Sequence, residues 1–169
     1  MKDAPHPGPD QRRPYAVVDV DGVLADVRHR LHHLESRPKD WDGFFAAAPH
    51  DPPLAEGLAV SRRLAEDHEL VYCSGRPERL RQATLDWFAR HDVPPGRLLL
   101  RRDGDRRPAR LVKLGILRRL ADERPVDVLV DDDAQVCATA RAAGFAVLEA
   151  DWMPSAPVLR EAQEGEGRT

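Results

Sequence analysis

The sequence is poor in several features that mark particular classes of protein, and each absence narrows what the chain can be. It has two cysteines, Cys73 and Cys137, without Cys-x-x-Cys spacing, so neither a disulfide framework nor a zinc site is expected and a reducing cytoplasm is the default location. No apolar run approaches the roughly 20 residues of a membrane-spanning helix. The net charge of −3 excludes a global positive field that would hold nucleic acid without specificity. Residues 1–14 lack the apolar core of a secretory signal.

What the sequence does contain is a regular alternation of predicted strands and helices within 169 residues, a length typical of one domain. Apolar runs predict strands at 15–20, 69–73, 98–100, 126–130 and 145–148, and helical spacing of apolar residues predicts helices between them. This order predicts an α/β fold, a Rossmann-like three-layer sandwich with a central parallel sheet and a small helical cap insert at about 26–53. We expect the domain to span 14–154, between a disordered leader at 1–13 and a flexible tail at 155–169.

Two aspartates follow the first predicted strand. Residues 15–18 are an apolar run typical of a strand buried on both faces, and Asp19, Asp21 and Gly22 come directly after it. Carboxylates at this end of a parallel strand lie where open α/β sheets bind their ligands. Asp19 could attack a phosphorus atom and form an aspartyl-phosphate, while Asp21 moves the proton of the leaving oxygen. The alternative is a polar turn after an ordinary strand.

Two further polar segments are expected at the same edge of the sheet. Ser74, Gly75 and Arg76 follow the second strand, where the serine and the backbone amides could hold phosphoryl oxygens. Lys113, near the start of a helix, could add a fixed positive charge against the same oxygens or against Asp19. Taken singly, the first segment could be a turn before a helix and the lysine could be solvated.

A second acidic pair follows the fourth predicted strand. Asp131 and Asp132, together with Asp19 and Asp21, offer the hard oxygen ligands that suit Mg²⁺. The cation would offset the repulsion between an anionic nucleophile and an anionic phosphate. An acidic helix N-terminus would explain the pair equally well by itself. The convergence of all these segments on one edge of the sheet favours a catalytic site.

The order of these motifs resembles that of the haloacid dehalogenase superfamily of phosphohydrolases. The residues that carry the resemblance are Asp19-Val20-Asp21-Gly22-Val23-Leu24 for the first motif, Ser74 for the second, Lys113 for the third and Asp131-Asp132 for the fourth. The resemblance implies that Asp19 is the nucleophile, Asp21 the general acid and base, and Mg²⁺ the cofactor. Val23 stands where that superfamily usually has threonine.

A closer similarity is to the 3′-phosphatase domain of bacteriophage-type polynucleotide kinase-phosphatase. It is carried by Asp19-Val20-Asp21-Gly22, Arg30, Ser74-Gly75-Arg76, Gly104-Asp105 and Asp131-Asp132 with Gln135-Val136. The similarity implies that Arg30 and Arg76 help to bind or position the substrate phosphate. The chain departs from that family at Ala109 and Asp133, where the family often has aspartate and arginine. It also lacks the GxxxxGK[ST] phosphate loop of a kinase domain.

Residues 101–110 carry five arginines and bear on the identity of the substrate. Arginine binds phosphates through its planar fork, so Arg101 and Arg102 are candidate contacts for further phosphates of a nucleotide or a strand. The alternative is a solvated loop, or arginines paired with the nearby aspartates. Trp41, Phe44 and Phe45 could likewise stack on a base or pack the cap.

Three functions are compatible with these patterns. The first is an Mg²⁺-dependent phosphatase that acts on nucleic acid 3′ ends or nucleotides, as a monomer or a homodimer and without a membrane partner. The second is a phosphatase for another small metabolite. The third is a non-catalytic, receiver-like domain that senses phosphorylation, although the Asp21-Gly22 pair after Asp19 argues against it.

Overall fold

The computed structural model describes residues 12–169, so most of the expected leader at 1–13 lies outside the described residues. Within that range five strands form one parallel sheet in the order β3-β2-β1-β4-β5, which confirms the predicted α/β fold. The strands are β1 (Tyr15–Val18), β2 (Glu69–Pro77), β3 (Gly96–Arg101), β4 (Val126–Asp131) and β5 (Val147–Glu149). The order reverses direction beside β1, so the carboxyl ends of β1 and β4 flank the switch point where such sheets bind ligands.

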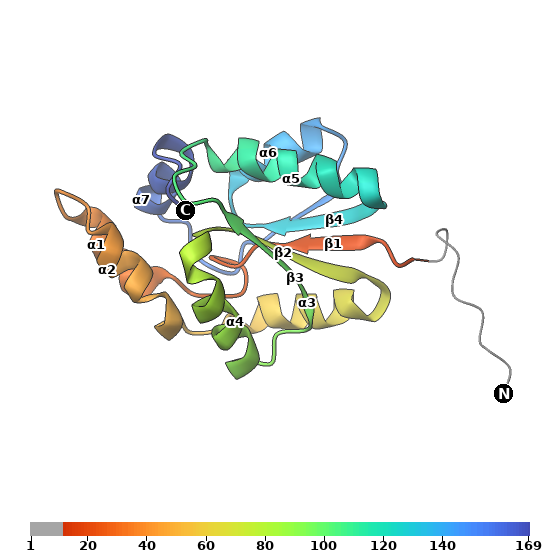
Figure 1. The fold of residues 1–169 in the computed structure, drawn as a ribbon, viewed down its shortest axis with the longest axis horizontal. Coiled ribbons are helices and arrows are strands. Elements are labelled where there is room, and N and C mark those ends of the chain that lie inside the picture. The colour runs from red at the N-terminus through yellow and green to blue at the C-terminus, as the bar shows by residue number, and fades with distance from the viewer. Residues whose placement is uncertain (1–11) are drawn as a thin grey trace, which may run out of the picture.

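Helices cover both faces of the sheet and complete a three-layer sandwich (Figure 1). On one face lie α3 (Ala55–Asp67) and α4 (Arg81–Arg90), and on the other α5 (Ala109–Glu123) and α6 (Ala134–Ala142). Alternate residues of β1 face the two layers: Val18 packs in the core with α3 and α4, and Val17 in the core with α5 and α6. Both valines are fully buried, as expected for a central strand made of apolar residues.

The cap lies beyond the carboxyl ends of the strands (Figure 1). It contains a 3-10 turn (Arg28–Arg30), α1 (His32–Glu35), α2 (Trp41–Ala46) and a second 3-10 turn (Ala48–His50), so the helical insert expected at about 26–53 consists of short pieces. Asp40 caps α2, and its side chain accepts a hydrogen bond of 2.9 Å from the Gly43 amide. Phe44 and Phe45 are buried in a third apolar core, which favours packing over base stacking for these two rings.

The C-terminal segment corrects the expectation of a flexible tail at 155–169. It forms α7 (Pro157–Arg160) and a π-helical turn (Glu161–Gly165). Leu159 and Ala162 are buried in the cap core, and glutamates of the segment pair with Lys39 and Arg110. A few apolar residues among many polar ones were too weak a pattern to predict this packing, because the partner surface comes from distant parts of the chain.

The strand β2 is longer than the sequence indicated. Its pairing with β3 continues past Ser74 to Pro77 with an irregularity, and α4 begins only at Arg81 after a 3-10 turn (Glu78–Leu80). Ser74, Gly75 and Arg76 therefore belong to an irregular strand end rather than to a turn.

No helix among residues 12–169 combines the length and the apolar character needed to cross a membrane.

Candidate active site

The carboxyl ends of β1 and β4 bring Asp19 and Asp131 together around the amino group of Lys113. Val18 lies opposite Val130 in the parallel register, so the two aspartates leave neighbouring strands at the same level. Lys113, on the first turns of α5, places its Nζ 2.9 Å from Asp19 Oδ2 and 2.5 Å from Asp131 Oδ2. Burial alone would lower the pKa of Lys113, but the carboxylates of Asp131 and Asp19 outweigh it and hold that pKa well above its usual value. The lysine therefore stays positively charged between the two carboxylates.

Three carboxylates of this edge fit a divalent cation. Oxygens of Asp19, Asp131 and Asp132 all lie within 4.8 Å of one another. Burial, with a further contribution from Asp131, raises the pKa of Asp19 to about 8 against the opposing effect of Lys113. Asp132 Oδ1 is buried and has no hydrogen-bond partner among the described residues. Buried carboxylates this close repel one another, so the cluster suits a hard cation with oxygen ligands such as Mg²⁺.

Gly22 shapes the same cluster from the loop after β1. Its φ of +83° is in the left-handed region, and a Cβ there would lie 2.1 Å from Asp132 Oδ2. Any other residue would both strain the backbone and displace a candidate metal ligand. The neighbouring Val23, which departs from the superfamily pattern, is fully buried in the main core, and its carbonyl accepts a 2.9 Å hydrogen bond from Trp152 Nε1.

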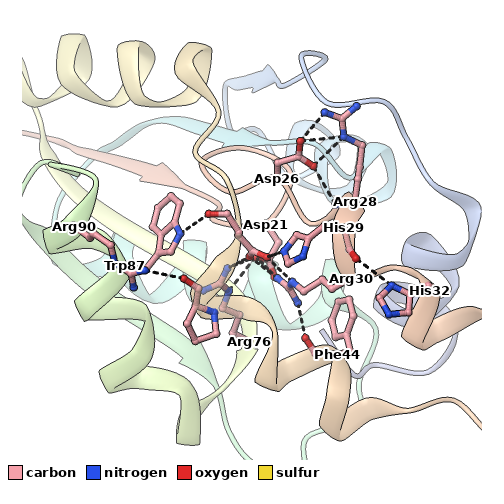
Figure 2. A network of polar contacts seen from close by, with 12 residues as sticks. Asp21, Asp26, Arg28, His29, Arg30, His32, Phe44, Arg76, Trp87 and Arg90 are labelled. Carbon is pink, nitrogen blue, oxygen red and sulfur yellow. Dashed lines mark hydrogen bonds and ion pairs between the residues drawn. The ribbon is translucent and has the colours of Figure 1, made fainter.

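The sequence predicted that Asp21 would be a metal ligand with the other aspartates. In the structure it lies outside the carboxylate cluster and faces two buried arginines (Figure 2). Its Oδ1 accepts hydrogen bonds from Arg76 Nε (2.9 Å), Arg76 Nη2 (2.6 Å) and Arg30 Nη2 (3.1 Å). Burial opposes ionisation, but Arg76 and Arg30 outweigh it and lower the pKa of Asp21. Asp21 Oδ2 is buried without a partner among the described residues. The side chain thus presents one unpaired carboxylate oxygen.

Asp51, which sequence reasoning missed, completes this network. Its carboxylate accepts two hydrogen bonds from Arg30 and one from Arg76, each of 2.8 Å, and a contact of 2.7 Å from His29 Nε2. Its carbonyl accepts a further 2.8 Å bond from Trp87 Nε1. Two arginines and two aspartates therefore neutralise each other in a buried cluster. Asp51 stands before two prolines in the cap, and nothing in that local pattern indicates a site.

Ser74 and Gly75 line the edge beside the cluster, but both are covered. Ser74 is 4% exposed, and its Oγ accepts a 3.2 Å hydrogen bond from the Arg76 amide. A Cβ on Gly75 would lie 1.9 Å from the carbonyl carbon of Thr169, so the end of the described chain packs directly on this glycine.

The two arginines expected to bind substrate differ in their surroundings. Arg101 is buried, and its guanidinium donates to the carbonyls of Asp105 (3.5 Å), Arg107 (2.8 Å) and Thr169 (3.2 Å), so it does not point freely to solvent. Arg102 is exposed at a cavity of about 310 Å³ beside α5. The loop is thus partly a structural element, through buried Arg101 and its backbone partners, and partly an exposed basic surface.

Comparisons with known proteins agree with this geometry. The family model of the polynucleotide kinase PNKP phosphatase domain matches residues 14–152. No curated protein is significantly similar in sequence. A solved Pnkp1/Rnl/Hen1 complex contains a chain with 19% identity and a TM-score of 0.70, over 86% of this chain and 48% of that one. This chain therefore spans about half the length of that relative.

Two other solved structures share the fold over most of both chains. A haloacid dehalogenase-like hydrolase from Streptococcus pneumoniae has 12% identity and a TM-score of 0.60, covering 88% of this chain and 89% of that one. A haloacid dehalogenase family enzyme from Bacteroides thetaiotaomicron, in complex with magnesium and inorganic phosphate, has 11% identity and a TM-score of 0.50 over 87% and 98%. The family match over residues 14–152 decides the assignment: the chain is a phosphatase that belongs to the PNKP phosphatase-domain family of haloacid dehalogenase-like hydrolases.

Proposed function

We propose that this phosphatase hydrolyses phosphomonoesters at nucleic acid 3′ ends or on nucleotides, with Mg²⁺ and through an aspartyl-phosphate on Asp19. The observation that carries the chemistry is the convergence of the Asp19, Asp131 and Asp132 oxygens within 4.8 Å, beside the amino group of Lys113. A nucleophile, a cation site and a fixed positive charge are the parts that phosphoryl transfer through a carboxylate requires.

The residues divide the proposed reaction between them. Asp19 Oδ1 is held by a 2.8 Å hydrogen bond from the Val20 amide and Oδ2 lies against Lys113, so the carboxylate is oriented before substrate arrives. Asp19 attacks phosphorus, the bond to the leaving oxygen breaks, and that oxygen takes a proton from Asp21. Water then attacks the aspartyl-phosphate, gives its proton to Asp21 and releases inorganic phosphate. Mg²⁺ bound by the aspartates would neutralise charge on the transferring group.

The proton role of Asp21 requires a change on substrate binding. Arg76 and Arg30 keep Asp21 ionised in the free protein, which suits a base but not an acid. An incoming phosphate dianion competes for the same two guanidinium groups, and their attraction to it weakens the field that ionises Asp21. Asp21 can then take up from solvent the proton that it gives to the leaving oxygen in the first step.

Family membership supports a nucleic acid substrate, as does the fold shared with a chain of an RNA repair complex. The exposed arginines of the 101–110 loop are suited to the extra phosphates of such a substrate. The two thiols are free and buried, which is compatible with a reducing compartment such as the cytoplasm.

A substrate screen tests the proposal. Phosphate release is measured with 3′-phosphorylated oligonucleotides, 3′- and 5′-mononucleotides and sugar phosphates, with and without Mg²⁺, for wild type and Asp19→Asn. We expect Mg²⁺-dependent release, fastest from the 3′-phosphorylated oligonucleotide. Preference for a sugar phosphate would instead identify a metabolite phosphatase.

A further inference from the structure

The last described residues lie on the surface where a substrate strand would be expected. Thr169 is 4% exposed, packs on Gly75 and accepts a 3.2 Å hydrogen bond from Arg101 through its carbonyl. Gly167, at a φ of +59°, lies so close to the arginine loop that a Cβ would be 2.1 Å from the Arg106 carbonyl oxygen. Residues 166–169 are therefore fitted between the irregular end of β2 and the arginine loop.

The charged groups of this segment pair with the basic groups around the site. Glu164 accepts hydrogen bonds from the guanidinium of Arg110 (2.6 Å) and from its amide (3.1 Å). Lys39 of the cap pairs with Glu161 at 3.1 Å and also with Glu166. These carboxylates lie where the phosphates of a strand would meet basic side chains.

An aromatic ring of the cap is covered in the same way. The guanidinium of Arg168 lies over the ring of Trp41, 4.6 Å from its centroid. Trp41 is partly exposed, whereas Phe44 and Phe45 are buried, and a base of a single strand could stack on the surface that Arg168 covers. In this segment the guanidinium of Arg168 thus takes the place that a base would have on Trp41. The glutamates take the places that phosphates would have on the basic side chains.

The site beneath the segment is closed. Asp19 is 2% exposed, Ser74 4% and Lys113 5%, so a phosphate ester cannot contact the nucleophile until something moves. The base of the segment is held by Leu159 and Ala162 in the cap core, whereas residues 166–169 are held by polar contacts and backbone packing. The distal part is accordingly the part that can leave without unfolding the cap.

We propose that residues 161–169 are an internal strap that occupies the strand-binding surface of the free protein, and that a polyanionic single strand displaces its distal part, residues 166–169, to open the site. The inference rests on the proposed function for the identity of the displacing partner. It gives a role to the glutamates of the strap, which are not part of the catalytic cluster. It also explains why Arg101, expected to bind substrate, is engaged by the chain itself.

The test compares two tail glycines. Gly167→Val places a side chain against the Arg106 and Arg107 carbonyls and should dislodge the strap, whereas in Gly165→Ala the new Cβ meets just Glu161 Cγ, at 3.7 Å. We expect Gly167→Val to raise kcat/KM for a 3′-phosphorylated oligonucleotide about three- to ten-fold, through a lower KM. Gly165→Ala should match wild type. Glu166→Lys, which sets a cation against Lys39 at the surface, should act in the same direction and serves if Gly167→Val folds poorly.

Hydrogen exchange separates this proposal from the proposed function. In Gly167→Val, amides of 70–80 should exchange faster than in Gly165→Ala, whether or not any ester is hydrolysed. In Asp19→Asn, a 3′-phosphorylated oligonucleotide should speed exchange in 161–169. If wild type, Gly167→Val and Glu166→Lys showed equal hydrogen exchange and equal kcat/KM, the strap proposal would be overturned. If no ester were hydrolysed but exchange in Gly167→Val were still faster, the proposed substrate would be rejected. The strap would still be supported as a cover of the site.

Discussion

Arg76 binds one oxygen of Asp21 with two hydrogen bonds, of 2.9 and 2.6 Å, and leaves the other oxygen of that carboxylate without a partner among the described residues. The geometry requires the planar fork of arginine, since Nε and Nη2 converge on one acceptor while Nη2 also reaches Asp51 at 2.8 Å. The arginine therefore fixes the orientation of the Asp21 carboxylate.

Replacing Arg76 should consequently impair catalysis. Arg76→Ala is expected to lower kcat/KM by about 10²-fold or more, because both the orientation of Asp21 and a charge for the phosphate are lost. Arg76→Lys should restore little, since an ammonium group cannot make the paired contacts. Steady-state kinetics of both variants, with circular dichroism to verify folding, measures this. Near-wild-type kcat/KM in Arg76→Lys would contradict the proposed role of the fork.

Asp51 should matter for stability as much as for activity. Asp51→Ala leaves Arg30 and Arg76 buried with one carboxylate between them, and breaking a buried ion pair costs about 3–5 kcal/mol. Urea denaturation measures the free energy of unfolding. Asp26→Ala is the matched control, because its partner Arg28 is half exposed and such a pair contributes little to stability. A similar loss in both variants would show that Asp51 does not anchor the arginines.

Gly22 provides a test of the metal site that leaves all carboxylates in place. Gly22→Ala sets a methyl group on Asp132 and should weaken Mg²⁺ binding and raise the Mg²⁺ concentration for half-maximal activity. Gly104→Ala is the control, since Gly104 has a nearly identical φ of +84° and no atom within 4 Å of a new Cβ. Both variants carry similar backbone strain. Equal Mg²⁺ dependence in the two would mean that Asp132 is not a ligand.

The first strand and the acidic motifs were predictable because each depends on local sequence. An apolar run ending in Asp19 and Asp21 fixes a central strand and its polar end, and the parallel order of strands places Lys113 and Asp131 at the same edge. Asp51 was not predictable, since its role comes from three partners on other segments. The side-chain direction of Asp21 was also missed, because its partners Arg30 and Arg76 come from other segments of the chain. The docking of residues 155–169 depends equally on surfaces formed by distant residues.

The two cysteines should be unreactive in the folded protein. Burial raises the pKa of both the Cys73 and the Cys137 thiol to about 12, so very little reactive thiolate exists near neutral pH. Because the folded pKa is raised, the associated stability is fully present below the unfolded thiol pKa of about 8.5 and is lost as pH rises toward 12.

Alkylation with iodoacetamide at about pH 8 checks this prediction, with the protein native and in urea. We expect labelling only of the unfolded protein, and a free energy of unfolding that falls above about pH 9. Fast labelling of native Cys73 would show that the β2 end is open, which would also bear against a closed site.

The most direct test of the central claim is to locate the phosphoryl group during turnover. The enzyme is mixed with Mg²⁺ and a 3′-phosphorylated oligonucleotide, quenched in acid, digested, and analysed by mass spectrometry alongside Asp19→Asn. We expect a phosphorylated peptide containing Asp19 in the wild type, and neither adduct nor phosphate release in a folded Asp19→Asn protein. Substantial turnover by Asp19→Asn, or an adduct on another residue, would contradict it.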